Sequence, residues 1–274
     1  VQSNFIARWN QAIDEKRFFS RGLVKIIQRA IRSPASSGSQ AGQIVRTMPK
    51  YSVTPTGERG CLESYQQAIR NASKYIYIED QYFRSRTIAL EIARAVLRNP
   101  KLIVIVVTMP DMLAESEWLG LGIASPSTYW TADSFNIIAK VIPNFCLFCL
   151  KSNDLNAAGA NVYVMVDLHA KIMFIEDIWY TIGSCNINER GFEYEGEINV
   201  CVHDPAGAMA LRLKLWGEHM LVTCPQDISI ATKLWFDHAR LNFEAEKNKA
   251  KPLSRIHSFN QRGPLLPVVP KNWM

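Results

Sequence analysis

The sequence of 274 residues lacks any uninterrupted run of about 20 apolar residues, the length that a helix needs to cross a bilayer. A membrane-spanning helix is therefore excluded. The first residues, VQSNFIARWN, also lack the charged start and the apolar stretch of a signal peptide. We expect that any targeting segment has been removed upstream.

Cysteine is scarce as well. Six cysteines in a chain of this length do not make a disulfide scaffold, although one or two bridges would fit an exported protein. Cys146 and Cys149 form a C-x-x-C pattern, but it lies in the apolar run 144–150 and has no second pair at zinc-finger spacing. We interpret both as buried strand residues and expect no metal ion or other cofactor. The compartment stays open, with a secreted or periplasmic location favoured.

Neither sign of charge dominates. Thirty-one Lys and Arg face 25 Asp and Glu, which gives a formal charge of +6. This mild basic excess favours partners that carry phosphate, and both nucleic acid and anionic lipid fit it. Hydrophobic residues make up 48% of the chain, which is enough for one large or two small domains with a real core.

Apolar residues recur at helix or strand spacing along most of the chain. The run LIVIVVT at 102–108 is unbroken and β-branched, which is typical of a strand in a sheet covered on both faces. The alternation predicts an α/β fold in which helices flank both faces of a mixed β-sheet. The other expected strands lie at 43–47, 75–83, 144–150, 162–166, 170–175 and 198–202, and the expected helices at about 1–30, 62–72, 88–97, 205–222 and 228–243.

Two segments have no clear period. Residues 110–133 form a long loop that holds Trp118 and Trp130, and either a packed excursion or a lid that contacts substrate would explain it. The tail from residue 246 is basic and rich in proline, and we expect it to be a surface arm.

His169 and Lys171 begin an expected strand, and residues two apart on a strand point to the same face. An imidazole can attack phosphorus or move a proton near neutral pH, and a neighbouring ammonium can neutralise phosphate oxygens. An H-x-K pattern alone is also common on exposed strands.

The residues that follow make the pattern specific: HAKIMFIEDIWYTIGSCNINERGFEYEGEINV. H-x-K-x4-acid, then Gly-Ser-x-Asn, then an acidic residue that opens a strand, resembles the HKD signature of the phospholipase D superfamily. The segments FIARWN, GQIVRTMP and YIYIEDQYF resemble other parts of phospholipases D, so the resemblance runs from about Asn4 to Asn242. The motif positions are matched by His169, Lys171, Gly183, Ser184, Asn186 and Glu197.

Each matched residue has an expected role. Ser184 and Asn186 can donate hydrogen bonds to phosphate oxygens, and Gly183 lets the backbone approach them. Glu197 can accept a hydrogen bond from the far nitrogen of His169 and so fix its tautomer. Glu176 replaces the usual Asp of the motif and should lie on the opposite face of the strand, so we interpret it as structural.

The sequence contains one H-x-K, because none of the other four histidines begins this pattern. Phospholipases D carry two such motifs, which share the work of nucleophile and proton donor. The resemblance therefore implies that this chain is a carboxy-terminal half that needs a second chain with the amino-terminal motif. A heterodimer from a cleaved precursor is favoured over a homodimer. The expected parts are a helical linking segment (1–42), the catalytic α/β domain (43–245) and the tail (246–274).

The resemblance further implies that the enzyme splits the head group from glycerophospholipids such as phosphatidylcholine. The reaction would pass through a phosphohistidine and could transfer the phosphatidyl group to alcohols. A homodimeric nuclease and a catalytically silent phosphoinositide- or protein-binding relative are the alternatives. Trp118 and Trp130 favour a lipid surface over nucleic acid, since a DNA groove would gather more Arg and Lys.

Overall fold

The structure, a computed structural model, describes residues 2–15, 22–27, 38–50, 54–110, 126–142 and 146–259. The helices are α1 (Gln2–Asp14), α2 (Gly60–Asn71), α3 (Arg86–Arg98), α4 (Pro126–Ala139), α5 (Pro205–Met220), α6 (Ile228–Lys247) and the π-helical turn η4 (Arg190–Tyr194). The strands are β1 (Ala41–Met48), β2 (Glu58–Arg59), β3 (Tyr75–Asp80), β4 (Phe83–Arg84), β5 (Ile103–Val107), β6 (Cys146–Leu155), β7 (Asn161–Met165), β8 (Lys171–Ile175), β9 (Trp179–Gly183), β10 (Ile187–Asn188), β11 (Glu197–His203) and β12 (Ile256–Ser258).

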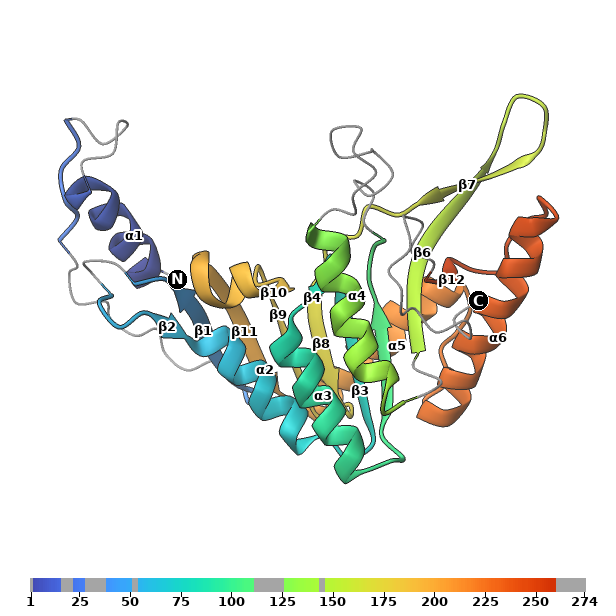
Figure 1. Cartoon of the computed structure of the whole chain (residues 1–274), viewed down its shortest axis with the longest axis horizontal. Coiled ribbons are helices and arrows are strands. Elements are labelled where there is room, and N and C mark those ends of the chain that lie inside the picture. Colours follow the sequence, from blue (N-terminus) through green and yellow to red (C-terminus); the bar gives the residue numbers. More distant parts are fainter. Residues whose placement is uncertain are drawn as a thin grey trace.

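One large sheet runs through the molecule in the order β12-β6-β5-β3-β8-β9-β11-β1-β2, and β7 pairs with β6 beside this path (Figure 1). The pairs β3–β5 and β5–β6 are parallel, whereas β8, β9, β11 and β1 join the sheet in antiparallel pairs. The sheet is therefore mixed, as the sequence predicts.

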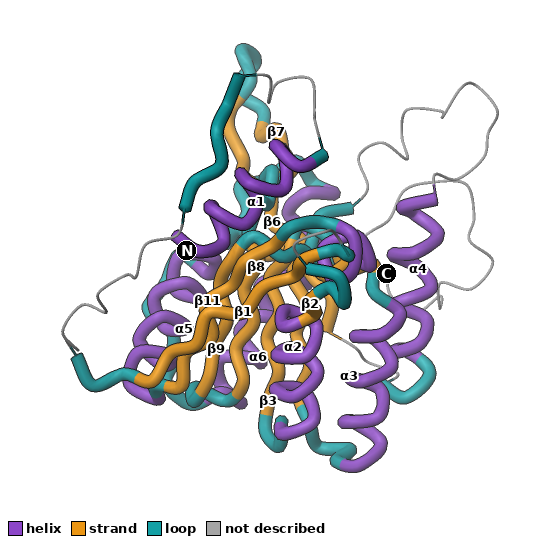
Figure 2. Tube along the Cα trace, turned by 90° about the vertical axis from the view of Figure 1, so that its left-hand side faces the viewer, coloured by secondary structure: helices purple, strands orange, loops and turns teal. Residues whose placement is uncertain are grey.

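Helices cover both faces of this sheet, as the view along its edge shows (Figure 2). On β3, Ile76 and Ile78 pack in the core beneath α2 and α3, whereas Tyr75 and Tyr77 pack with residues of α5 and α6, among them Trp216. The alternating sequence YIYI thus buries a different apolar set on each face. The predicted α/β fold with helices on both faces is confirmed.

The expected helix over the first 30 residues is wrong at residues 22–27, whereas residues 16–21 and 28–30 lie outside the described residues. Residues 23–27 form no helix; instead Asn10 hydrogen-bonds through its side chain to both N and O of Ile26, at 2.8 and 2.9 Å. The indole of Trp9 donates to the carbonyl of Val24 at 3.0 Å. These contacts satisfy backbone groups that a helix would otherwise have paired.

Two other expectations need correction. The long loop expected at 110–133 ends earlier, because α4 begins at Pro126, a residue well suited to a first helical turn. The tail expected to be a surface arm contains β12, which pairs with β6 at the edge of the sheet. The strand β9 was not predicted, although it lies between β8 and β11, the two strands that begin at the candidate site described below.

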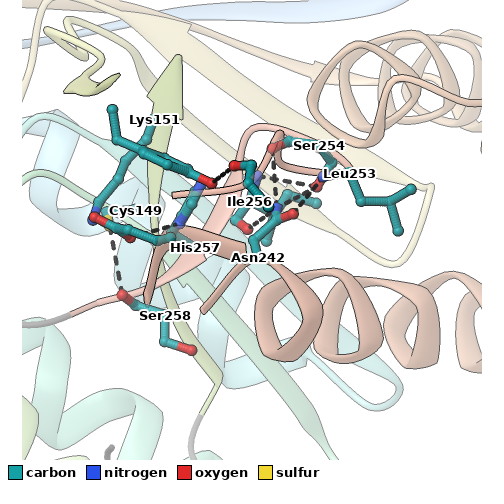
Figure 3. A network of polar contacts seen from close by, with 11 residues as sticks. Cys149, Lys151, Asn242, Leu253, Ser254, Ile256, His257 and Ser258 are labelled. Atoms are coloured by element: carbon teal, nitrogen blue, oxygen red, sulfur yellow. Dashed lines mark hydrogen bonds and ion pairs between the residues drawn. The ribbon is translucent and has the colours of Figure 1, made fainter. Parts of the chain in front are cut away.

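Side chains hold this tail in place (Figure 3). The amide of Asn242 on α6 donates to the carbonyls of Ser254 and Ile256 at 3.0 and 2.7 Å, and its oxygen accepts from the backbone of Leu253 at 2.7 Å. His257 is 2% exposed.

None of the helices in the described part of the chain is both long and apolar enough to span a bilayer.

Candidate active site

The residues matched by the motif gather at one end of the sheet, the upper end in Figure 1. There β3 and β9 end while their antiparallel neighbours β8 and β11 begin. Asp80 at the end of β3 lies opposite Lys171 at the start of β8, and Gly183 at the end of β9 lies opposite Asn199 of β11. The order of the strands thus joins segments that are far apart in sequence.

His169 precedes β8 and is exposed, whereas Lys171 is only 6% exposed. The ammonium of Lys171 donates to the carbonyl of His169 at 3.1 Å and to Oε1 of Gln81 at 3.2 Å. Burial lowers the pKa of Lys171, and the carboxylates of Asp80 and Glu197 oppose this shift. An exposed histidine is therefore joined through its backbone carbonyl to a partly desolvated cation, which is a suitable arrangement for binding and cleaving a phosphate ester.

Asp80 is fully buried and fixes a second part of the site. Its two carboxyl oxygens accept from the backbone of Tyr82 at 2.9 Å and from the backbone of Ile187 at 3.3 Å. Burial raises the pKa of Asp80 well above its usual range, while these two amides and Lys171 act in the opposite direction. Because Ile187 follows Asn186 directly, Asp80 ties the turn that carries Asn186 to the end of β3.

Ser184 and Glu197 contact each other directly. The hydroxyl of Ser184 donates to the carboxylate of Glu197 and accepts from the backbone of Ile198 at 3.1 Å. Burial raises the pKa of Glu197, the bond from Ser184 lowers it, and Glu195 and Lys171 have smaller, opposing effects. Within the described ranges no hydrogen bond joins Glu197 to His169, so the expected bond to the imidazole is replaced by the bond to Ser184.

The amide of Asn186 has unused hydrogen-bonding capacity. Its Oδ1 is buried and has no partner among the described residues. Leaving such a group unsatisfied costs about 1–3 kcal/mol, which makes it a rare feature of folded proteins.

The packing of the sheet itself requires a glycine at position 183. A Cβ at this position would overlap the side chain and Cα of Asn199 and the carbonyl of Ile198. The backbone of Gly183 therefore approaches the neighbouring strand β11 closely, and the expected approach to phosphate stays a prediction.

Glu176 lies in the turn between β8 and β9, at the far end of β8 from Lys171. Its carboxylate accepts from the backbone amides of Ser73 and Lys74, and its own φ is +58°. The next residue, Asp177, binds the buried Arg212 at 2.6 and 2.8 Å. Both acidic residues thus hold the end of the sheet that lies opposite the site.

Of the two tryptophans expected at a lipid surface, Trp118 lies outside the described residues. Trp130 is on the first half of α4, is 47% exposed and stacks edge-on against Tyr129, which is 53% exposed. No cluster of side chains suited to a metal ion occurs in the ranges that the structure describes.

Asp80 and Gln81 are the site residues that sequence reasoning missed. The available signal was the change from the apolar YIYI to the polar EDQ at the end of a buried strand. Polar residues at such a position often serve a site at the edge of the sheet.

Comparison with known proteins agrees with this fold and motif. The sequence model of a family described as "Cardiolipin synthase, PLD-like domain" matches residues 65–217, which is more than half of the chain. The chain belongs to the phospholipase D superfamily, whose members are phosphodiesterases and phospholipid-modifying enzymes. The resemblance inferred from the motif is thereby confirmed.

Particular relatives are distant. Phospholipase D A of Dictyostelium discoideum is 26% identical over 80% of this chain and 20% of its own length. Cardiolipin synthase 1 of Staphylococcus epidermidis is 24% identical over 93% of this chain and 44% of its own length. The chain thus spans less than half of these curated relatives. Among solved structures, NucT from Helicobacter pylori is 21% identical, with a TM-score of 0.45 over 67% of this chain and 96% of its own.

Proposed function

We propose that this chain supplies one half of an active site that cleaves the head-group phosphodiester of glycerophospholipids. The observation that carries the proposal is the placement of His169. His169 is exposed at the end of the sheet, and its backbone carbonyl accepts from the ammonium of the buried Lys171. This ammonium interacts in turn with the carboxylate of Glu197, which accepts a hydrogen bond from Ser184. A phosphate bound here would meet an ammonium, a hydroxyl and an amide within reach of a group that can transfer protons near neutral pH.

The chain carries a single H-x-K motif, and for this reason we propose that it needs a partner chain. Displacement at phosphorus through a covalent intermediate requires a nucleophile and an acid that protonates the leaving oxygen. One histidine would have to do both at once. We assign the nucleophile to a histidine of a second chain, which would form the phosphohistidine, and we assign general acid and base catalysis to His169. A partner derived from the same precursor is favoured over a second copy of this chain.

Two observations support a lipid substrate. The relatives include proteins named as phospholipases D and proteins named as cardiolipin synthases. Tyr129 and Trp130 also expose aromatic rings near the start of α4, and such rings favour the boundary between water and lipid. The acceptor that ends the reaction is water in hydrolysis and an alcohol in phosphatidyl transfer.

Reconstitution tests the proposal. The chain is purified alone and together with every polypeptide that co-purifies with it from its source, and release of choline from phosphatidylcholine is measured. We expect no turnover by the chain alone and turnover by the complex, which His169→Asn should lower by about 100-fold or more. A primary alcohol should compete with water and yield a phosphatidyl-alcohol. Full activity of the monomeric chain would contradict the half-site, and cleavage of DNA in place of lipid would contradict the substrate.

A further inference from the structure

Gln81 directly follows β3 and is held by the strands on either side. Its backbone N–H donates to the carbonyl of Ala170 at 3.1 Å, and its own carbonyl accepts from the hydroxyl of Thr108 at 3.2 Å. Its side chain accepts from the ammonium of Lys171 at 3.2 Å. Contacts with two different segments therefore fix the backbone of Gln81 and the oxygen of its side-chain amide.

The hydrogen bond from Lys171 also fixes the orientation of the side-chain amide of Gln81. An ammonium only donates hydrogen bonds, so the oxygen of the amide must face Lys171 and the NH2 must face elsewhere. Gln81 is partly exposed, and its side-chain nitrogen neither donates to another described residue nor is buried. The NH2 is thus open to solvent beside the charge of Lys171.

The ammonium of Lys171 also has an N–H donor that is not used by the described residues. It carries three N–H donors, and two of them go to the carbonyl of His169 and to Oε1 of Gln81. Within the described part of the chain, this leaves one N–H for a ligand. A phosphoryl group that accepts it would lie next to the NH2 of Gln81.

We propose that Gln81 is a phosphoryl-binding residue, whose NH2 donates a hydrogen bond to a non-bridging phosphate oxygen while its Oε1 holds the ammonium of Lys171. This inference rests on the phosphate site of the proposed function and adds a residue that lies 88 positions before His169, outside the H-x-K segment. A neutral donor suits the position because it strengthens anion binding without repelling Lys171.

Titration with dimethyl phosphate and with inorganic phosphate, followed by NMR of the side-chain amides in the whole chain, tests the proposal. The two anions separate recognition of a phosphodiester from recognition of a free phosphate. Gln81→Leu removes the donor at similar size and should weaken binding about tenfold, as expected for a hydrogen bond to a charged group. Gln81→Glu keeps the oxygen for Lys171 but repels the anion, and should weaken binding at least as much. Gln67→Leu changes an exposed glutamine on α2 and is the matched control.

The pKa of Lys171, read from the chemical shift of its side chain, provides a second measurement. The groups that face its ammonium are Asp80, Glu197, Gln81 and the carbonyl of His169. Gln81→Glu should raise this pKa and Gln81→Leu should lower it, whereas Gln67→Leu should leave it unchanged.

Lys171→Met separates the two proposals. Binding that depends on Lys171 but is equal in wild type, Gln81→Leu and Gln81→Glu would overturn the role of Gln81 and leave the proposed function standing. Loss of binding in the variants at Gln81, with a folded protein by circular dichroism, supports the role. Absence of binding by wild type, or binding unaffected by Lys171→Met, would overturn the phosphate site itself and with it both proposals.

Discussion

The side chain of Asn199 lies across Gly183, its cross-strand partner on β9. Asn199 is 1% exposed, donates to the hydroxyl of Thr181 at 3.2 Å and accepts from the backbone of Cys185 at 3.1 Å. Cys185 stands between Ser184 and Asn186. The absence of a side chain at Gly183 therefore lets a buried amide hold the turn that carries both polar residues of the motif.

Gly183→Ala should disrupt this arrangement, because the new methyl group would overlap Asn199 and the backbone of β11. We expect the free energy of unfolding to fall by about 3 kcal/mol, as in other overpacked sites. Gly42→Ala is the matched control on strand β1, where the nearest atom to an added Cβ is 3.7 Å away. Urea unfolding of the two variants checks the prediction, and equal changes in both would contradict it.

Local patterns in the sequence predicted much of the fold. The alternation in YIYI and the unbroken run of β5 identify buried strands, because each face of the sheet is covered by helices. Short elements escaped this reasoning. The strand β12 has three residues, too few for a period to show, and it joins the sheet through pairing with β6.

Of the residues at the candidate site, only those that belong to the motif were predicted from sequence. His169, Lys171, Ser184 and Glu197 lie within one stretch of sequence and come together through the neighbouring strands β8, β9 and β11. The contribution of Asp80 depends on the pairing of β3 with β8, which joins residues about 90 positions apart. No local spacing encodes that pairing, so the change from YIYI to EDQ marks polar residues at the end of β3 but does not show which residues they meet.

The buried His257 should make stability depend on pH. Its Nδ1 lies 3.3 Å from Glu246, whose carboxylate also binds Lys151 at 2.6 Å, and burial lowers the pKa of His257 to about 4. The unfolded chain titrates near the ordinary histidine pKa of about 6.5. As pH falls from 6.5 to 4, the unfolded chain therefore takes up a proton that the folded protein does not. The free energy of unfolding should fall by about 3 kcal/mol over this range.

Urea unfolding at pH 7 and at pH 4.5 measures this effect. His257→Gln should remove most of its contribution to the pH dependence, because glutamine does not titrate. His203→Gln, at an exposed position at the end of β11, is the control and should keep the slope of wild type. A slope that is the same in all three proteins would show that other groups govern the acid sensitivity.

Tyr129 and Trp130 should contribute to action on a lipid surface. Replacing both with Ala removes apolar area that would be buried at the interface, so cleavage of vesicle phosphatidylcholine by the assembled enzyme should fall about tenfold. Cleavage of a short-chain, monomeric phosphatidylcholine should change little. Leu97→Ser, at an exposed apolar residue of α3, is the control. Equal losses on both substrates would indicate a role in packing or catalysis instead of interfacial binding.

The role of His169 as acid and base can be separated from that of a nucleophile. Choline is a poor leaving group as an alkoxide and needs a proton from a positioned acid, whereas a nitrophenolate departs almost unaided. In the assembled enzyme, His169→Asn should lower turnover of phosphatidylcholine by about 100-fold or more and should slow the first step with a nitrophenyl phosphatidyl ester much less. The same change removes the base that activates water, so the covalent intermediate should persist on the partner chain. Acid quenching followed by peptide mapping locates the phosphoryl label. A label on the peptide that contains His169 in the wild-type enzyme would reverse the two roles and make this chain the source of the nucleophile.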